Sequence, residues 1–228
     1  MLQSVTMPTN TLEVAREVTT ELGLIWNPHL ETIIGFCAAT AGFDGFPKIG
    51  KRSFDPSNEE AMRAYLKIYV SRYFVEIDTQ LILKPASTTA DPAIDVILKA
   101  FAGIDDTATV STQHRQAMAA ENLLGSLLER YLASMLEPHG WVWCAGNTVR
   151  SVDFLSSDLR VALQVKNRDN SENSSSSAIR RGTTINKWFR IYSASGRTNW
   201  TQFPARVAGV QPSEEGFYAY IQAYALRR

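Results

Sequence analysis

The stretch from Val152 to Arg168, VDFLSSDLRVALQVKNR, constrains the fold of this chain more than any other. Asp153 lies inside an apolar run, and a second apolar run carries Gln164, Val165 and Lys166. The Ser-Ser-Asp sequence between the two runs is typical of a tight turn. The stretch therefore predicts two neighbouring strands, with Gln164 and Lys166 on one face of the second strand.

The rest of the chain divides into a helical half and an α/β half. Apolar residues at helical spacing predict helices over residues 11–22, 28–41, 57–83, 91–101 and 113–137. Residues 102–112 read as a connector, and Ser57 with Glu60 resembles a capping box. Short strands are expected over residues 141–145, 149–155 and 159–166, with a closing strand or helix over 216–226. We expect a mainly helical region, residues 1–112, packed on an α/β core, residues 113–228.

Composition excludes several classes of protein. The chain has 228 residues, of which 45% are hydrophobic and 20% charged, as in globular domains. It shows no signal peptide and no apolar run near the ~20 residues that span a bilayer, so we expect no membrane association. The two cysteines, Cys37 and Cys144, predict buried thiols in a cytoplasmic protein, and no Cys/His cluster suggests zinc.

The charge of the chain is balanced overall but not locally. Lys and Arg number 23, as do Asp and Glu, yet residues 145–210 hold ten basic and four acidic residues. A local basic excess on a neutral protein favours a surface for a polyanion, and an ordinary solvated face is the alternative.

The side chains of the central stretch suit metal-dependent cleavage of a phosphodiester. Mg²⁺ prefers oxygen ligands and keeps several waters, so Asp153, the Gln164 amide oxygen and the Val165 carbonyl can hold it. Lys166 then faces the same phosphate, where it orients the attacking water or stabilises developing charge. Each residue alone also has a structural reading, as a hydrogen-bonded acid or the solvent face of an edge strand.

A glutamate on the preceding helix is the second acid of the predicted site. Glu121 lies close to the apolar stripe of that helix, and Glu129 lies at its margin. Either carboxylate can reach the edge of the sheet if the helix packs against it, and the spacing alone does not choose between them.

Two further segments have the composition of DNA-contacting surfaces. The tract after Lys166 is rich in Asn, Ser and Arg, the residue types that bind bases and phosphates, although a flexible loop has the same composition. The residues predicted to bind DNA are Arg168, Asn173, Ser174, Ser175, Arg180, Arg181, Lys187, Arg190 and Arg197. The Gly-rich basic segment 42–53 could also touch phosphates, but a surface connector is the favoured reading.

The motifs VDF and LQVKNR resemble those of the PD-(D/E)xK nuclease superfamily. The run QVKNRDNSENSSSSAIRRGTTINKWFR is similar to type II restriction endonucleases of the SinI kind. This resemblance, over residues 121–200, implies a mixed sheet flanked by helices, Mg²⁺ dependence, a homodimer and cleavage of a GGWCC-like palindrome. The superfamily's helix acid matches Glu129, with Gly125 before it and Gly140 after it. Val152 replaces the expected proline, and Gln164 replaces the second acid.

The sequence therefore predicts a Mg²⁺-dependent, site-specific endonuclease of double-stranded DNA. Asp153 and Gln164 bind the metal, Glu129 assists through water and Lys166 acts on the nucleophile or phosphate. Two alternatives remain: a non-catalytic nucleic-acid-binding protein with a degenerate nuclease fold, and a structure-specific DNA repair nuclease.

Overall fold

A computed structural model describes residues 11–40, 42, 44–84, 91–170, 185–204 and 211–227. Contacts divide the chain into two compact units, one of residues 1–79 with 131–228 and one of residues 80–130. The domain boundary expected after residue 112 stays a prediction.

Three helices form the N-terminal part of the larger unit: α1 (Thr11–Glu21), α2 (Pro28–Ala39) and α3 (Glu59–Asp78). All three were predicted. Asn58 caps α3 by accepting a hydrogen bond from the Ala61 N–H at 3.0 Å, so the predicted capping box at Ser57 is wrong. α3 ends at Asp78, so the predicted helix was too long at its C-terminus.

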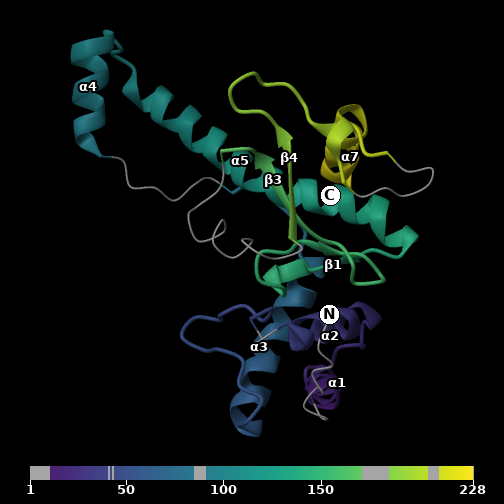
Figure 1. Ribbon diagram of the computed structural model, residues 1–228. Helices are drawn as coiled ribbons and strands as arrows, with labels where there is room; N and C mark the ends of the chain where they lie inside the picture. The colour runs from purple at the N-terminus through teal and green to yellow at the C-terminus, as the bar shows by residue number, and fades with distance from the viewer. Residues whose placement is uncertain are drawn as a thin grey trace. The chain divides into compact units, whose positions relative to one another are not determined.

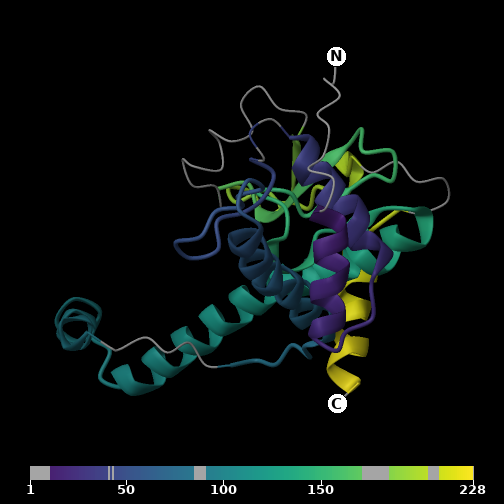
Figure 2. The same cartoon turned by 90° about the horizontal axis from the view of Figure 1, so that it is seen from below.

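The long α3 helix forms the core of this region. α1 lies beside α3 (Figures 1 and 2), and the inner face of α3 buries Met62, Tyr65, Leu66, Tyr69, Val70 and Tyr73. These residues follow the helical stripe seen in the sequence, because residues three and four apart share one face of a helix.

The smaller unit contains two helices. α4 (Pro92–Ala102) confirms the helix predicted over residues 91–101, and the Asp91 side chain caps it by accepting a hydrogen bond from the Ala93 N–H at 2.9 Å. α5 (Thr107–Leu136) begins within the segment expected to be a connector, so that part of the prediction is wrong. The last residues of α5, from Tyr131 onward, belong to the larger unit.

A four-stranded mixed sheet follows α5 in the order β1-β2-β3-β4 (Figure 1). Its strands are β1 (Val142–Trp143), β2 (Phe154–Leu155), β3 (Ala162–Arg168) and β4 (Ile185–Ile191). β1, β2 and β3 pair antiparallel, whereas β3 and β4 pair parallel. The sheet and its helices confirm the predicted α+β class with a mixed sheet.

Two parts of the sheet differ from the prediction. Residues 149–152 form a tight turn closed by a Val149–Val152 bridge, and only Phe154–Leu155 remain as strand. The other difference is β4, which the sequence placed inside the DNA-contacting tract. The polar residues of β4 conceal an alternation in which Trp188 and Arg190 are buried on one face.

The chain ends in α7 (Glu214–Leu226), which decides between the strand and helix readings of this segment. Ser213 caps α7 by accepting a hydrogen bond from the Gly216 N–H at 3.0 Å. The buried Phe217 ring lies 5.5 Å from the ring of Tyr131 on α5. Within the described ranges, no helix is both long and apolar enough to cross a membrane.

Candidate active site

Asp153 is held against β3 by two hydrogen bonds to the residues on either side of Gln164, one through its backbone N–H and one through its carboxylate. The Asp153 N–H donates to the Leu163 carbonyl at 2.8 Å, and the Val165 N–H donates to Asp153 Oδ2 at 2.7 Å. The Val165 N–H thus bonds to the side chain of Asp153 instead of its backbone carbonyl, which accepts the Cys144 N–H. This geometry fixes the carboxylate beside Gln164 and commits one of its two oxygens.

Burial dominates the electrostatics of Asp153. The half-buried side chain lies among apolar residues, and desolvation raises its pKa to about 6. The Val165 N–H hydrogen bond and the positive charge of Lys166 oppose this shift by lowering the pKa. A carboxylate disfavoured by burial gains from any added cation, which is the property a metal ligand needs.

Gln164, Lys166 and Arg168 follow one another along one face of β3, because alternate residues of a strand share a face. Their exposure rises in that order: Gln164 is buried, Lys166 is half-buried and Arg168 is exposed. The structure therefore places an amide, an ammonium and a guanidinium in a row that leads from Asp153 to solvent.

β4 adds another lysine to this face. Lys187 pairs with Gln164 in the parallel register of β3 and β4, so the two side chains leave the sheet on the same side. Lys187 Nζ donates to the Asp169 carbonyl at 3.5 Å. The Asp169 carboxylate in turn accepts the Ser193 N–H at 2.8 Å, which joins the ends of β3 and β4.

The oxygen donors at Asp153 and Gln164 fit a hard cation such as Mg²⁺, which binds few protein oxygens and keeps several waters. Among the described residues, no cluster of three or more His, Cys, Asp or Glu side chains could hold a metal. The superfamily pattern has an acid at the position of Gln164, so the amide there lowers the number of carboxylates in the site. A site of this kind has low negative charge and supports one cation better than two.

Arg190 has a different environment from the other basic residues of the tract. Its side chain is 6% exposed, and its guanidinium forms an ion pair with Glu214 of α7. Arg190 Nε donates to Asn167 Oδ1 at 3.0 Å, and the guanidinium lies 5.3 Å from the Phe217 ring centre. The charge of Arg190 thus joins β3, β4 and α7, and in this structure it is occupied by protein contacts.

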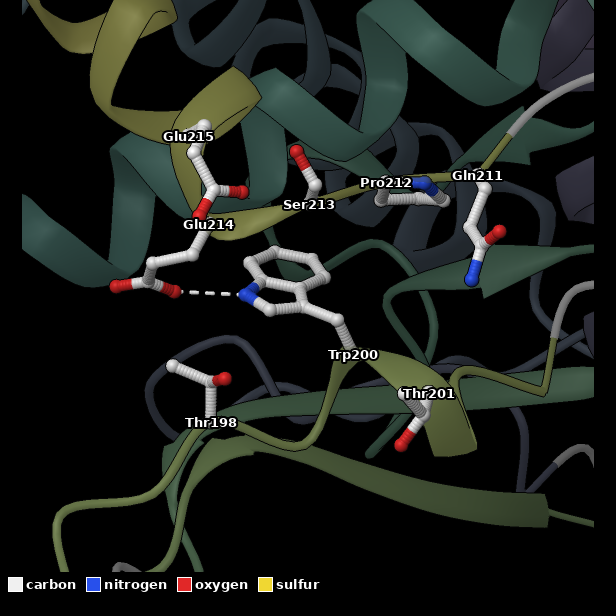
Figure 3. Close-up of a pocket in the computed structure, with 8 residues that line it drawn as sticks. All are labelled: Thr198, Trp200, Thr201, Gln211, Pro212, Ser213, Glu214 and Glu215. Atoms are coloured by element: carbon white, nitrogen blue, oxygen red, sulfur yellow. Dashed lines mark hydrogen bonds between the residues drawn. The ribbon is translucent and has the colours of Figure 1, made fainter.

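A cavity next to the Arg190–Glu214 ion pair is lined by none of the predicted catalytic residues. It has a volume of about 320 Å³ and is lined by Thr198, Trp200, Thr201, Gln211, Pro212, Ser213, Glu214 and Glu215. Figure 3 shows the Trp200 indole N–H donating to Glu214, over 2.7 Å. The cavity therefore gives water access to Glu214, and Asp153 is not among its lining residues.

The remaining predicted residues are distributed as follows. Glu129 is half-buried and Glu121 is exposed on α5, in the part of that helix that belongs to the smaller unit. Arg197 is exposed, with its guanidinium 5.7 Å from the Tyr192 ring centre. Asn173, Ser174, Ser175, Arg180 and Arg181 lie outside the described residues.

The partners of Asp153 and Arg190 were not predicted. Asp153 accepts a backbone N–H, from Val165, and a backbone donor is the same at every residue type except proline. Glu214 lies 24 residues from Arg190 in the sequence, and no local pattern links the two.

Comparison with known proteins gives a consistent result over most of the chain. A model described as the SinI restriction endonuclease matches residues 46–226. The chain is 44% identical over 165 residues to the type II restriction enzyme Eco47I of Escherichia coli, across 70% of this chain and 72% of that enzyme. It is also 44% identical over 146 residues to the type II restriction enzyme SinI of Salmonella infantis, across 61% of this chain and 64% of that enzyme.

Proposed function

Since the chain belongs to the SinI restriction endonuclease family, we propose that it cuts double-stranded DNA at one short sequence, with Asp153, Gln164 and Lys166 at the cleavage site. The family resemblance and the enzyme class predicted from the sequence, a type II restriction enzyme, are confirmed by the family match and both relatives. The observation that carries the site proposal is the Asp153 carboxylate, held by the Val165 N–H beside the row of Gln164 and Lys166.

The proposed cofactor is Mg²⁺, held by Asp153 and Gln164. When bound, the metal supplies charge for the scissile phosphate and lowers the pKa of a coordinated water. The protein positions the reactants. Because Asp153 Oδ2 accepts the Val165 N–H, the carboxylate cannot rotate freely, and Oδ1 is the oxygen that would bind the metal.

Lys166 is proposed to act on the phosphate or on the attacking water. It shares a face of β3 with Gln164 and is half-buried, so its charge is only partly screened by solvent. Glu129 is proposed to assist through a water molecule, ahead of Glu121, because Glu129 matches the superfamily spacing and is the less exposed of the two.

The proposed substrate is a GGWCC-like palindrome bound by a homodimer, since a two-fold symmetric sequence matches a two-fold symmetric protein. Base and backbone contacts are proposed for Arg168, Lys187 and Arg197 and for the predicted residues between 173 and 181. We omit Arg190 from this surface, because contact with DNA would require it to leave Glu214. The buried thiols Cys37 and Cys144 support a cytoplasmic location.

Digestion of a sequenced phage DNA with and without Mg²⁺ tests the function. The proposal predicts discrete fragments, in the presence of the metal only, whose ends all lie at one palindrome. Duplex binding without cleavage in any divalent metal would instead support a non-catalytic binding protein. Cutting confined to nicks or junctions would support a structure-specific nuclease.

Single substitutions test the site. Asp153→Ala should abolish cutting, and Lys166→Ala should lower the rate by roughly 100- to 1000-fold, because each removes charge stabilisation from the transition state. Asp158→Ala is the matched control. Asp158 lies on the exposed turn before β3, and within the described part of the chain its carboxylate bonds to the neighbouring Ser156 and Arg160, so this variant should cut normally. Wild-type rates for Asp153→Ala would refute the site.

A further inference from the structure

We propose that the loop of residues 46–54, here called the basic loop, contacts the phosphate backbone of duplex DNA beside the cleavage site. The proposal builds on the proposed function, because it takes DNA as the substrate. The basic loop has the sequence FPKIGKRSF, which contains three cations and no acid. This charge lies in an N-terminal half that is otherwise acidic, with ten basic and fourteen acidic residues in positions 1–120.

Aromatic packing holds both ends of the basic loop. The Phe46 and Phe54 rings are stacked with their centres 4.0 Å apart, and Phe46 is 5% exposed. Both rings lie edge-on to the Tyr65 ring of α3, and the Tyr65 hydroxyl donates to the Pro47 carbonyl at 2.7 Å. The loop is therefore a built part of the larger unit, with its stem inserted into the helical core.

A tight turn forms the tip and presents the cations to solvent. The Ile49 N–H donates to the Arg52 carbonyl at 2.9 Å, and the Arg52 N–H donates back to the Ile49 carbonyl at 3.0 Å. Gly50 has φ of +62°, a conformation that glycine adopts without strain. The Ile49 side chain is buried, whereas Lys48, Lys51 and Arg52 are all exposed. The turn thus holds the three charged side chains at the surface, and because its backbone is already ordered, it loses little conformational entropy on binding.

These three cations have no acidic partner among the described residues. No ion pair with them occurs in the part of the chain that the structure describes, and the nearest acids in sequence have other partners. Asp44 pairs with Arg150 at 3.6 Å, and Asp55 accepts hydrogen bonds from the N–H and hydroxyl of Ser57. The basic loop therefore keeps an uncompensated positive charge.

The base of the basic loop is attached to the segment that carries Asp153. The Arg150 N–H donates to the Gly45 carbonyl at 2.9 Å, which joins the residue before the loop to the segment that precedes β2. A Cβ at Gly45 would lie 2.7 Å from Cys37 Cα, so this close approach requires glycine. Asp153 follows three positions after Arg150, which limits the distance between their Cα atoms to about 11 Å.

This attachment of the loop to the segment before Asp153 favours DNA as the partner. Duplex DNA carries one negative charge per about 1.7 Å of its axis, so a duplex with one phosphate at Asp153 presents a row of further phosphates to the surface around it. Lysine and arginine at such a position bind phosphates independently of sequence. We therefore expect the basic loop to add affinity and orientation to the complex, without reading bases.

The salt dependence of DNA binding tests this role. Binding of a labelled duplex is measured by fluorescence anisotropy in EDTA, between about 50 and 200 mM salt. The variant Lys48→Gln/Lys51→Gln/Arg52→Gln should lower the slope of log K against log [salt] by about 2 to 3, because each lost phosphate contact removes about 0.9. The decrease should be the same for a duplex with the cleavage sequence and for an unrelated duplex.

Two control variants make the test specific. Lys84→Gln/Lys99→Gln/Arg115→Gln removes the same charge from exposed positions of the smaller unit and should leave the slope unchanged. Lys48→Arg/Lys51→Arg/Arg52→Lys keeps the charge and should bind like wild type. An unchanged slope in the loop variant, or an equal loss in the first control, overturns the proposal. A reduced slope in a protein that cuts no DNA would support the basic loop and refute the proposed function.

Discussion

Removal of the Glu214 carboxylate should destabilise the protein by leaving the Arg190 charge buried without its counter-ion. Arg190 is 6% exposed and Glu214 is 12% exposed, so water screens this pair poorly. Breaking one side of a buried ion pair costs about 3 to 5 kcal/mol. Asn167 still accepts from Arg190 Nε, and the adjoining cavity lets water reach Trp200, so we expect about 4 kcal/mol for Glu214→Ala.

Three further variants separate charge from packing. Glu214→Gln keeps an acceptor for the Trp200 indole and should cost about 2 kcal/mol. Arg190→Leu/Glu214→Leu removes both charges and should be more stable than Glu214→Ala. Glu215→Ala, the exposed neighbour, should cost less than about 0.5 kcal/mol.

Urea unfolding at neutral pH measures these free energies, with an unchanged m-value showing that only stability has changed. Two results would refute the reasoning. One is a loss below about 1 kcal/mol for Glu214→Ala, which would mean that solvent already screens the pair. The other is a double variant that is less stable than Glu214→Ala, which would mean that packing and not charge dominates.

Three other predictions concern pH and backbone strain. Burial raises the pKa of Glu214, but hydrogen bonds from Tyr218 and Trp200 and the positive charge of Arg190 outweigh burial, so the pKa is lowered overall. The ionised Glu214 therefore stabilises the fold above its unfolded-state pKa, and this stability is lost as pH falls through the folded-state pKa. The stability difference between wild type and Glu214→Gln in urea should therefore shrink in acid. Burial raises the pKa of Asp153 to about 6, so ionisation destabilises the metal-free fold as pH rises from about 4 to 6. Asp153→Asn in EDTA should gain about 2 kcal/mol near pH 8 and nothing near pH 4; a loss near pH 8 would contradict this. Gly146→Ala should lower the free energy of unfolding by at least about 3 kcal/mol in thermal or urea unfolding, because φ is +72° and the new Cβ would lie 2.5 Å from the Arg72 carbonyl oxygen. Gly50→Ala also has a positive φ but open space around the new Cβ, so it should cost about 1 kcal/mol. Equal losses in the two variants would contradict the clash at Gly146.

The stretch from Val152 to Arg168 shows how much of the structure local sequence patterns can predict. Two short apolar runs around a Ser-Ser-Asp turn predicted neighbouring strands with Asp153, Gln164 and Lys166 in one region, and β2 and β3 provide that arrangement. Strand alternation and turn chemistry are local properties, so the sequence alone contains them. The same holds for the positions of α1, α2 and α4, which the local spacing of apolar residues predicted.

The role of Arg190 was decided only by the tertiary structure. In the sequence it is one of several arginines in a polar tract, and nothing local distinguishes it from Arg197. The parallel pairing of β4 with β3 buries Arg190 beside Asn167, and α7 brings Glu214 to it from 24 residues away. Parallel strands are joined by a long crossover connection, and the residues of a strand carry no pattern that shows which strand it pairs with.

By itself, the sequence determined the family, the α+β class and the residues from which a phosphodiesterase site can be built. Only the tertiary structure decided which basic residues stabilise the fold and which remain on the surface. It buried Arg190 with Glu214, and it attached the basic loop to the segment before Asp153 through a backbone hydrogen bond at Gly45. The physical reason is that the desolvation and pairing of a charge depend on residues remote in sequence, whereas residue type and spacing are read directly from the chain.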